Sequence, residues 1–114
     1  MKLVESTDGG STVITVQGRL DSGTAPVLEE RLSALLATSD TRLLIELSAL
    51  EYISSAGLRV FLVLAKRIKA LGGRLVLCGM GQPVRQVFQL AGFLPLFAIE
   101  PSRDAALQAI GSQP

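Results

Sequence analysis

The chain has 114 residues, of which 48% are hydrophobic and 18% charged, and its net charge is +1. This length and composition fit one folded domain and argue against a disordered chain. The charge is too balanced for a basic stripe, so no direct nucleic-acid partner is expected. The sequence contains no histidine, which excludes Ser-His-Asp and Cys-His catalysis and histidine metal ligands.

The first predicted elements are a β-hairpin and a helix. Strands at Lys2–Glu5 and Thr12–Gln17 flank the turn Asp8-Gly9-Gly10, a typical hairpin pattern. A helix is predicted to begin near Thr24 and to end at Ser39-Asp40. Its apolar residues recur at helical spacing, at Leu28, Leu32, Leu35 and Leu36.

Strands and helices then alternate to the end of the chain. They are predicted at Arg42–Leu47 (strand), Gly57–Leu71 (helix), Arg74–Cys78 (strand), Pro83–Ala91 (helix), Leu96–Ile99 (strand) and in a last helix capped by Ser102. The order is β-β-α-β-α-β-α-β-α. It predicts a single α/β domain over residues 1–110, followed by a short tail at 111–114. We expect a mixed, mostly parallel sheet with helices packed mainly on one face.

Several properties of the chain indicate a cytoplasmic protein. Cys78 is the single cysteine and stands in an apolar run, which indicates packing in a reduced compartment. Residues Met1–Glu5 lack the apolar core of a signal peptide, and no uncharged stretch reaches the length of a membrane span. We therefore expect no membrane insertion. The sequence shows no heptads, so a monomer or weak dimer is expected.

The most informative segment is Tyr52–Leu58, where two serines stand between a predicted strand end and an apolar helix. The start of a helix has unpaired N–H groups and a partial positive charge. A serine there can cap the helix, bind an anion or accept a phosphate. Plain capping, by Ser54 above all, is the structural alternative to a functional role.

The helix after the serines is apolar on nearly all sides in its first two turns. A helix on one face of a sheet buries only one stripe, here predicted at Leu58, Phe61, Leu62, Ala65 and Ile68. Val60 and Val63 are therefore predicted to be exposed beside Ser55, unless a neighbouring helix covers them. An exposed apolar patch of this kind often marks a protein interface.

Two motifs resemble a known family. Residues 48–58 are similar to the signature of STAS domains, in particular the bacterial anti-sigma factor antagonists, and Gly18-Arg19-Leu20-Asp21 resembles the family's Gly-x-Leu-Asp turn. The element order agrees with the same fold. Ser54 stands where many members have aspartate, and Glu46 likewise replaces a common aspartate.

The resemblance implies a phosphorylation switch. The unmodified protein would bind an anti-sigma factor serine kinase and free the sigma factor. Phosphorylation at Ser55, or at Ser54 as second choice, would end that binding, and a PP2C-type phosphatase would reset it. The resemblance and the apolar helix together predict a partner-binding surface at Asp21, Ser54, Ser55, Ala56, Gly57, Arg59, Val60 and Val63. For Asp21, a purely local turn-forming role is the alternative.

The sequence also has features of two other functions. Gly79-Met80-Gly81 begins like a dinucleotide fingerprint, with Glu100 about twenty residues on, but Val84 replaces the third glycine and Pro83 removes an N–H. An NAD-dependent enzyme is therefore rejected, and no cofactor, metal or catalytic residue is expected. The remaining alternative is a STAS accessory subunit of a transport system or signalling assembly that undergoes no phosphorylation.

Overall fold

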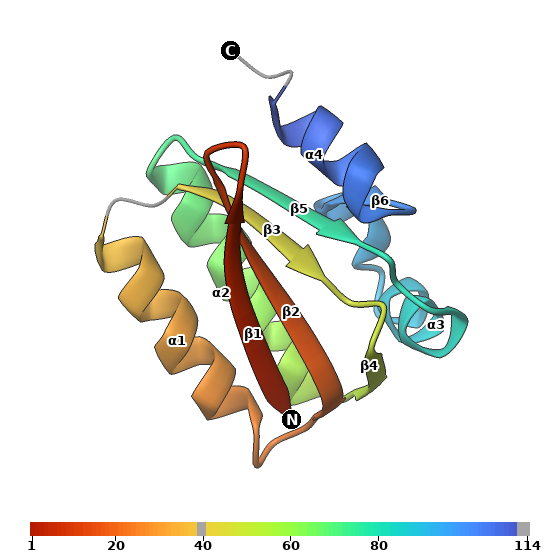
Figure 1. The fold of residues 1–114 in the computed structure, drawn as a ribbon. Coiled ribbons are helices and arrows are strands. Elements are labelled where there is room, and N and C mark those ends of the chain that lie inside the picture. Colours follow the sequence, from red (N-terminus) through yellow and green to blue (C-terminus); the bar gives the residue numbers. More distant parts are fainter. Residues whose placement is uncertain (39–40, 112–114) are drawn as a thin grey trace.

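The computed structural model describes residues 1–38 and 41–111, which form a mixed sheet with helices on both of its faces (Figure 1). The strands are β1 (Lys2–Asp8), β2 (Ser11–Leu20), β3 (Arg42–Glu46), β4 (Leu50–Ile53), β5 (Arg74–Cys78) and β6 (Ala98–Glu100). The helices are α1 (Ala25–Ala37), α2 (Ser55–Ala70), α3 (Gln82–Leu90) and α4 (Arg103–Gly111), with a 3-10 turn η1 at Leu94–Leu96.

The predicted hairpin is confirmed. β1 and β2 pair antiparallel, and Asp8 faces Ser11 across a two-residue turn. Both turn residues have positive φ, 58° at Gly9 and 85° at Gly10, which glycine adopts without steric cost. The other strand pairs are parallel, in the order β1-β2-β3-β5-β6. The predicted mixed and mostly parallel sheet is therefore confirmed.

Alternation along the strands divides the buried residues between two cores. Leu43, Ile45 and Leu77 point into the larger core, which also holds the apolar faces of α1, α2 and α3. Leu44 and Val76 point to the opposite face and pack under α4. Figure 1 shows α1 and α2 beside each other, with α4 on the other side of the sheet. The prediction that helices pack mainly on one face is confirmed, with α4 as the exception.

Two elements differ from the sequence prediction. The short strand β4 was not predicted. Only three residues separate it from β3, and four residues are too few to show the alternation of apolar and polar side chains that marks a strand. The last strand begins two residues later than predicted, at Ala98, since Pro95 lies in the turn η1. The predicted helix end at Ser39-Asp40 lies outside the described residues. The last helix runs through Gly111, one residue beyond the predicted domain.

β4 is the element that brings the serine turn to the end of β2. It pairs parallel with β2, so that Arg19 faces Tyr52 and Leu20 faces Ile53. The register shifts between Gly18 and Arg19, and Gly18 adopts a φ of 90° while its N–H donates to the Ala49 carbonyl at 3.0 Å. A β-bulge of this kind bends a strand and redirects its side chains. The two sequence motifs therefore lie on neighbouring strands.

Candidate functional site

The two serines of the turn have different environments. Ser54 is the N-cap of α2: its Oγ accepts from the Gly57 N–H at 3.3 Å, and its own N–H donates to the Leu20 carbonyl at 2.9 Å. Ser55 is the first residue of the helix and is exposed. Among the residues that the structure describes, no hydrogen-bond partner is recorded for its hydroxyl. The capping role predicted for Ser54 is confirmed, and Ser55 is left open to solvent.

Gly57 belongs to the core rather than to the surface. A Cβ atom at this position would lie 2.8 Å from Leu20 Cγ and 2.9 Å from Ile53 Cγ1. Such distances are shorter than van der Waals contact, so any side chain would push α2 away from β2 and β4. Glycine here allows the first turn of α2 to approach the strand ends closely. Gly57 is itself buried, so its structural role is to position Ser54 and Ser55.

Asp21 organises the turn that leads from β2 into α1. Its Oδ1 accepts from the Gly23 N–H at 3.0 Å, the Thr24 N–H at 3.1 Å and the Thr24 hydroxyl at 3.2 Å. Desolvation opposes ionisation, but these hydrogen bonds and the nearby Arg19 charge hold the pKa of Asp21 below its ordinary value. Asp21 therefore has the local turn-forming role that was the alternative to partner binding. Asp21 nevertheless lies close to the serines, since Leu20 bonds directly to Ser54.

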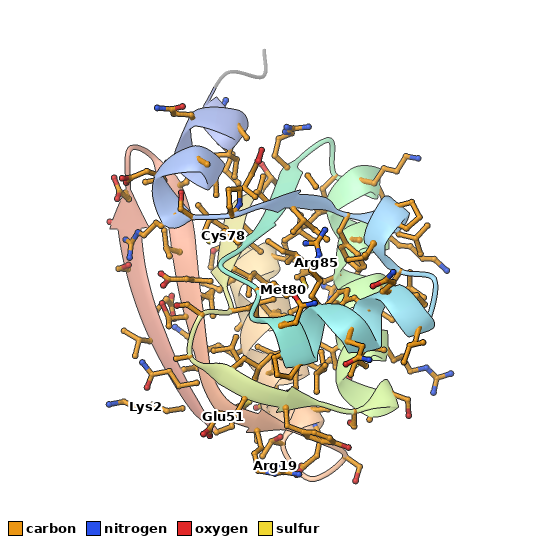
Figure 2. All side chains as sticks on the ribbon, turned by 90° about the vertical axis from the view of Figure 1, so that its right-hand side faces the viewer. Lys2, Arg19, Glu51, Cys78, Met80 and Arg85 are labelled. Atoms are coloured by element: carbon orange, nitrogen blue, oxygen red, sulfur yellow. The ribbon has the colours of Figure 1, made fainter. Side chains whose placement is uncertain are left out.

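Arg19 and Tyr52 form the rim of the site beside Asp21. The Arg19 guanidinium carbon lies 4.2 Å from the centre of the Tyr52 ring, a cation–π arrangement. Tyr52 is 39% exposed, as expected for a residue at the edge of the core. Figure 2 shows Arg19 at the end of the molecule, well away from Cys78. Arg19 was not among the predicted site residues, although it stands within the Gly18–Asp21 motif.

A groove runs between α1 and α2 next to Ser55. It has a volume of about 410 Å³. The residues that line it from α2 are Ala56, Arg59, Val60 and Val63. The residues from α1 and the preceding turn are Ser22, Ala25, Pro26 and Glu29. The first group was predicted and the second was not, because no pattern in one sequence reveals which helix lies beside α2.

The predicted exposure of Val60 is wrong. Val60 is 6% exposed, whereas Val63 is 40% exposed, as predicted. The reason is the packing of α1 against α2, which adds Val60 and Leu64 to the buried stripe. The wall of the groove is therefore apolar at its base and opens to solvent at Val63. Arg59 and Glu29 line it with charges of both signs.

The described part of the chain offers no metal site and no membrane-spanning helix. Residues 1–38 and 41–111 contain no group of three or more Cys, Asp or Glu side chains that could hold a metal ion. None of the described helices is long and apolar enough to span a membrane. Cys78 is buried, and burial together with the Glu46 charge raises the pKa of its thiol to about 11 despite the opposing effect of Arg103. The predicted packing role of Cys78 fits this environment.

The geometry defines an α/β domain that presents an exposed serine hydroxyl at a helix start, beside a groove with an apolar base and a charged rim. The sequence matches the family model of the STAS domain over residues 2–106. The chain therefore belongs to the STAS domain family. This membership confirms the resemblance inferred from residues 48–58 and from the turn at Gly18–Asp21.

Three similar proteins have names that point to one activity. BtrV of Bordetella bronchiseptica, a proposed anti-sigma factor antagonist, is 41% identical, with 96% of this chain and 94% of BtrV covered. The anti-sigma-F factor antagonist RsfB of Mycobacterium tuberculosis is 30% identical, with 89% and 82% covered. The crystal structure of an anti-sigma factor antagonist from Mycobacterium paratuberculosis superposes with a TM-score of 0.89 at 30% identity, with 97% and 94% covered.

Proposed function

We propose that this protein is a cytoplasmic anti-sigma factor antagonist controlled by phosphorylation of Ser55. The unmodified protein binds an anti-sigma factor serine kinase and thereby frees a sigma factor. Phosphorylation ends the complex, and a PP2C-type phosphatase restores the binding form. The protein itself acts by binding and not by catalysis.

The observation that carries the proposal is that Ser54 is hydrogen-bonded in the helix cap, whereas Ser55 is exposed. Ser54 already makes three hydrogen bonds, through its N–H, Oγ and carbonyl groups. Ser55 is exposed, and its hydroxyl has no recorded partner in the described part of the chain. A kinase can therefore reach Ser55 without first breaking a cap. The names of the similar proteins support an anti-sigma partner for this surface.

The start of α2 tolerates a phosphate. A phosphoserine has about −1.5 to −2 charges at neutral pH. The first turn of α2 has no acidic residue, so nothing there offsets the partial positive charge of the helix start. Arg59 lies one turn further along α2, at the spacing where oppositely charged side chains interact. The fold therefore accommodates the modification, and its cost falls on the complex.

Loss of binding follows from desolvation. A partner that packs on Val63 and the groove beside it would have to bury the added charge, which costs several kcal/mol unless it is paired. Because about 1.4 kcal/mol corresponds to a tenfold change in affinity, one phosphate is sufficient to separate the proteins. Ser55→Asp, which adds one charge, should weaken the complex less than phosphate does and leave the circular dichroism spectrum unchanged.

The proposal is tested with the cognate kinase and ATP. Intact-mass and fragment mass spectrometry should find one phosphate, on Ser55, in the wild type and in Ser54→Ala. Ser55→Ala should remain unmodified and still bind the kinase. A phosphate on Ser54, or one that persists in Ser55→Ala, would contradict the assignment. If no serine kinase binds the protein, the accessory-subunit function becomes the better account.

A further inference from the structure

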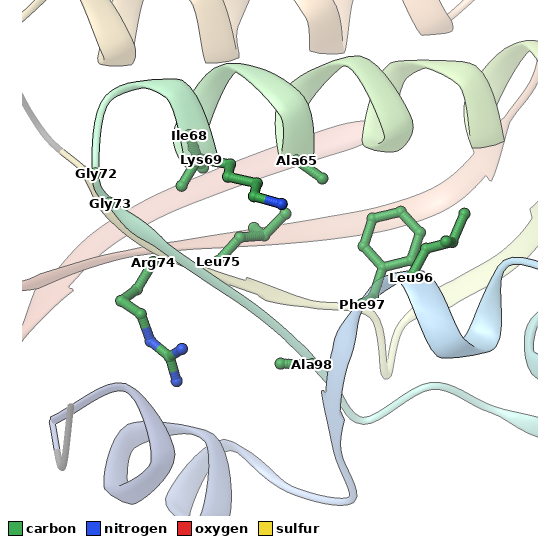
Figure 3. A pocket seen from close by; sticks show the side chains of 10 residues that line it. All are labelled: Ala65, Ile68, Lys69, Gly72, Gly73, Arg74, Leu75, Leu96, Phe97 and Ala98. Atoms are coloured by element: carbon green, nitrogen blue, oxygen red, sulfur yellow. The ribbon is translucent and has the colours of Figure 1, made fainter.

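A second hollow lies at the other end of α2, away from Ser55 (Figure 3). Its volume is about 390 Å³. The residues that line it come from the last two turns of α2, the glycine turn that follows, the start of β5 and the chain that enters β6. A hollow of this size is in the range of small-molecule sites.

The hollow exists because one edge of β5 is left uncovered at its start. β6 pairs with β5 only from Val76 onward, since the chain before Ala98 turns away through η1. The Arg74 N–H donates to the Thr41 carbonyl on the β3 side at 2.7 Å. Successive residues of a strand direct their N–H groups to opposite edges, so the Leu75 N–H points to the open edge and toward the hollow.

Two cationic side chains reach the open edge from opposite layers. Lys69 extends from α2 above the edge, and Arg74 extends below it toward α4 (Figure 3). Arg74 Nη2 donates to the Ala109 carbonyl at 3.5 Å, a long contact. Arg74 Nε is buried and has no hydrogen-bond partner in the described part of the chain. None of the described residues that line the hollow is acidic.

The C-terminal end of α2 lies beside the hollow. The C-terminal end of a helix repels anions, but the carbonyl groups of Ile68 and Lys69 are occupied by the N–H groups of Gly73 and Gly72. The donor groups at the edge therefore favour a bound anion.

The rest of the wall is apolar. Leu96 and Phe97 lie across from Lys69, and Leu96 is 54% exposed. A free inorganic anion would use the cationic groups and leave this wall in water. A molecule with an anionic group and an apolar body would use both, because burial of apolar surface adds to the ionic contacts.

We propose that the hollow binds a small organic anion, a carboxylate with an alkyl or aryl body. The carboxylate lies beside Lys69 at the open edge of β5, within reach of the Leu75 N–H, and Arg74 adds positive charge from the opposite side of the edge. The apolar body lies on Leu96 and Phe97. This site is separate from Ser55 and does not depend on the phosphorylation proposed above.

The test is a titration of the ¹⁵N-labelled protein with octanoate, followed by amide chemical shifts. We expect saturable shifts at Gly72, Gly73, Leu75 and Ala98. Lys69→Gln should weaken binding about tenfold, the loss that fits one charge-assisted hydrogen bond. Lys66→Gln is the matched control, since it removes an exposed charge from the same helix outside the hollow and should leave the affinity unchanged.

Two further probes separate the parts of the proposal. 1-Octanol has the same apolar chain without the charge, and inorganic phosphate has charge without the chain. Both should bind at least tenfold more weakly than octanoate. Equal affinity for octanol would overturn the ionic contacts, and equal affinity for phosphate would overturn the apolar wall. Shifts confined to the groove beside Arg59, or binding unaffected by Lys69→Gln, would overturn the site.

Discussion

At the scale of single residues, two neighbouring serines have different environments. Ser54 and Ser55 are adjacent, yet one is bound to Gly57 and Leu20 and the other faces solvent. The difference arises because an N-cap residue has extended backbone geometry, here φ −95° and ψ 175°, which turns its Oγ toward the free N–H groups of the first turn. The following residue is helical and points outward.

Substitution of the two serines by alanine should therefore affect stability differently. Ser54→Ala removes the cap and should lower the free energy of unfolding by about 1 kcal/mol. Ser55→Ala removes an exposed hydroxyl and should change it by less than about 0.5 kcal/mol. Urea denaturation of both variants measures the difference. Equal losses would show that Ser55 also supports the helix start, and would weaken its assignment as a free acceptor.

Gly57 should be intolerant of even the smallest side chain. The Cβ of Gly57→Ala would collide with Leu20 and Ile53, which are both fully buried. Overpacking of this kind costs about 1–3 kcal/mol. Gly111→Ala is the control, because a Cβ there meets nothing within 4 Å. A Gly57→Ala protein as stable as the wild type in thermal unfolding would mean that α2 can shift outward at no cost.

At the scale of elements, the pairing of α1 with α2 decides which apolar side chains are available to a partner. Val60 faces α1 and is buried, whereas Val63 lies at the open side of the groove. An isolated helix cannot reveal this difference, since both valines fall outside the stripe that faces the sheet. The surface offered by α2 is therefore narrower than its sequence suggests.

Val63→Glu should weaken binding to the anti-sigma kinase at least tenfold, because the complex would have to bury the new charge. Its effect on the free energy of unfolding should stay within about 0.5 kcal/mol, since Val63 is partly in water. Lys66→Glu, on the same helix outside the groove, serves as the control for added negative charge. Binding can be measured by titration calorimetry. A large loss of stability, or unchanged affinity, would contradict the groove as the docking surface.

Elements with a long sequence pattern could be predicted, whereas very short elements could not. The long apolar spacing of α1 and α2 and the glycine turn of the hairpin were sufficient to predict these elements from sequence. β4 and η1 were not predictable, because four and three residues are too few to show a period. Within the site, motif residues such as Ser55 could be found, while Glu29 and Ser22 could not. Their place depends on tertiary packing alone.

At the scale of the whole molecule, the sheet separates two cores of unequal size. The larger is shared by three helices and the smaller by α4 alone, through Ala106 and Ile110. α4 is short, with nine residues, and has a single layer of buried contacts. Short helices with few buried contacts open at lower free energy than the global fold. Cys78 lies under α4 and can report such an opening.

Labelling of Cys78 should therefore follow the detachment of α4. Burial raises its thiol pKa to about 11, so at pH 8 the folded protein holds it protonated and covered. A thiol reagent such as 5,5′-dithiobis(2-nitrobenzoic acid) can react only after an opening, in which the pKa returns to about 8.5.

Ile110→Val weakens the smaller core by about 1 kcal/mol and should speed labelling about fivefold. Ile68→Val weakens the larger core by a similar amount and should leave labelling unchanged, because it does not favour detachment of α4. Equal acceleration by both variants would mean that the two cores open together.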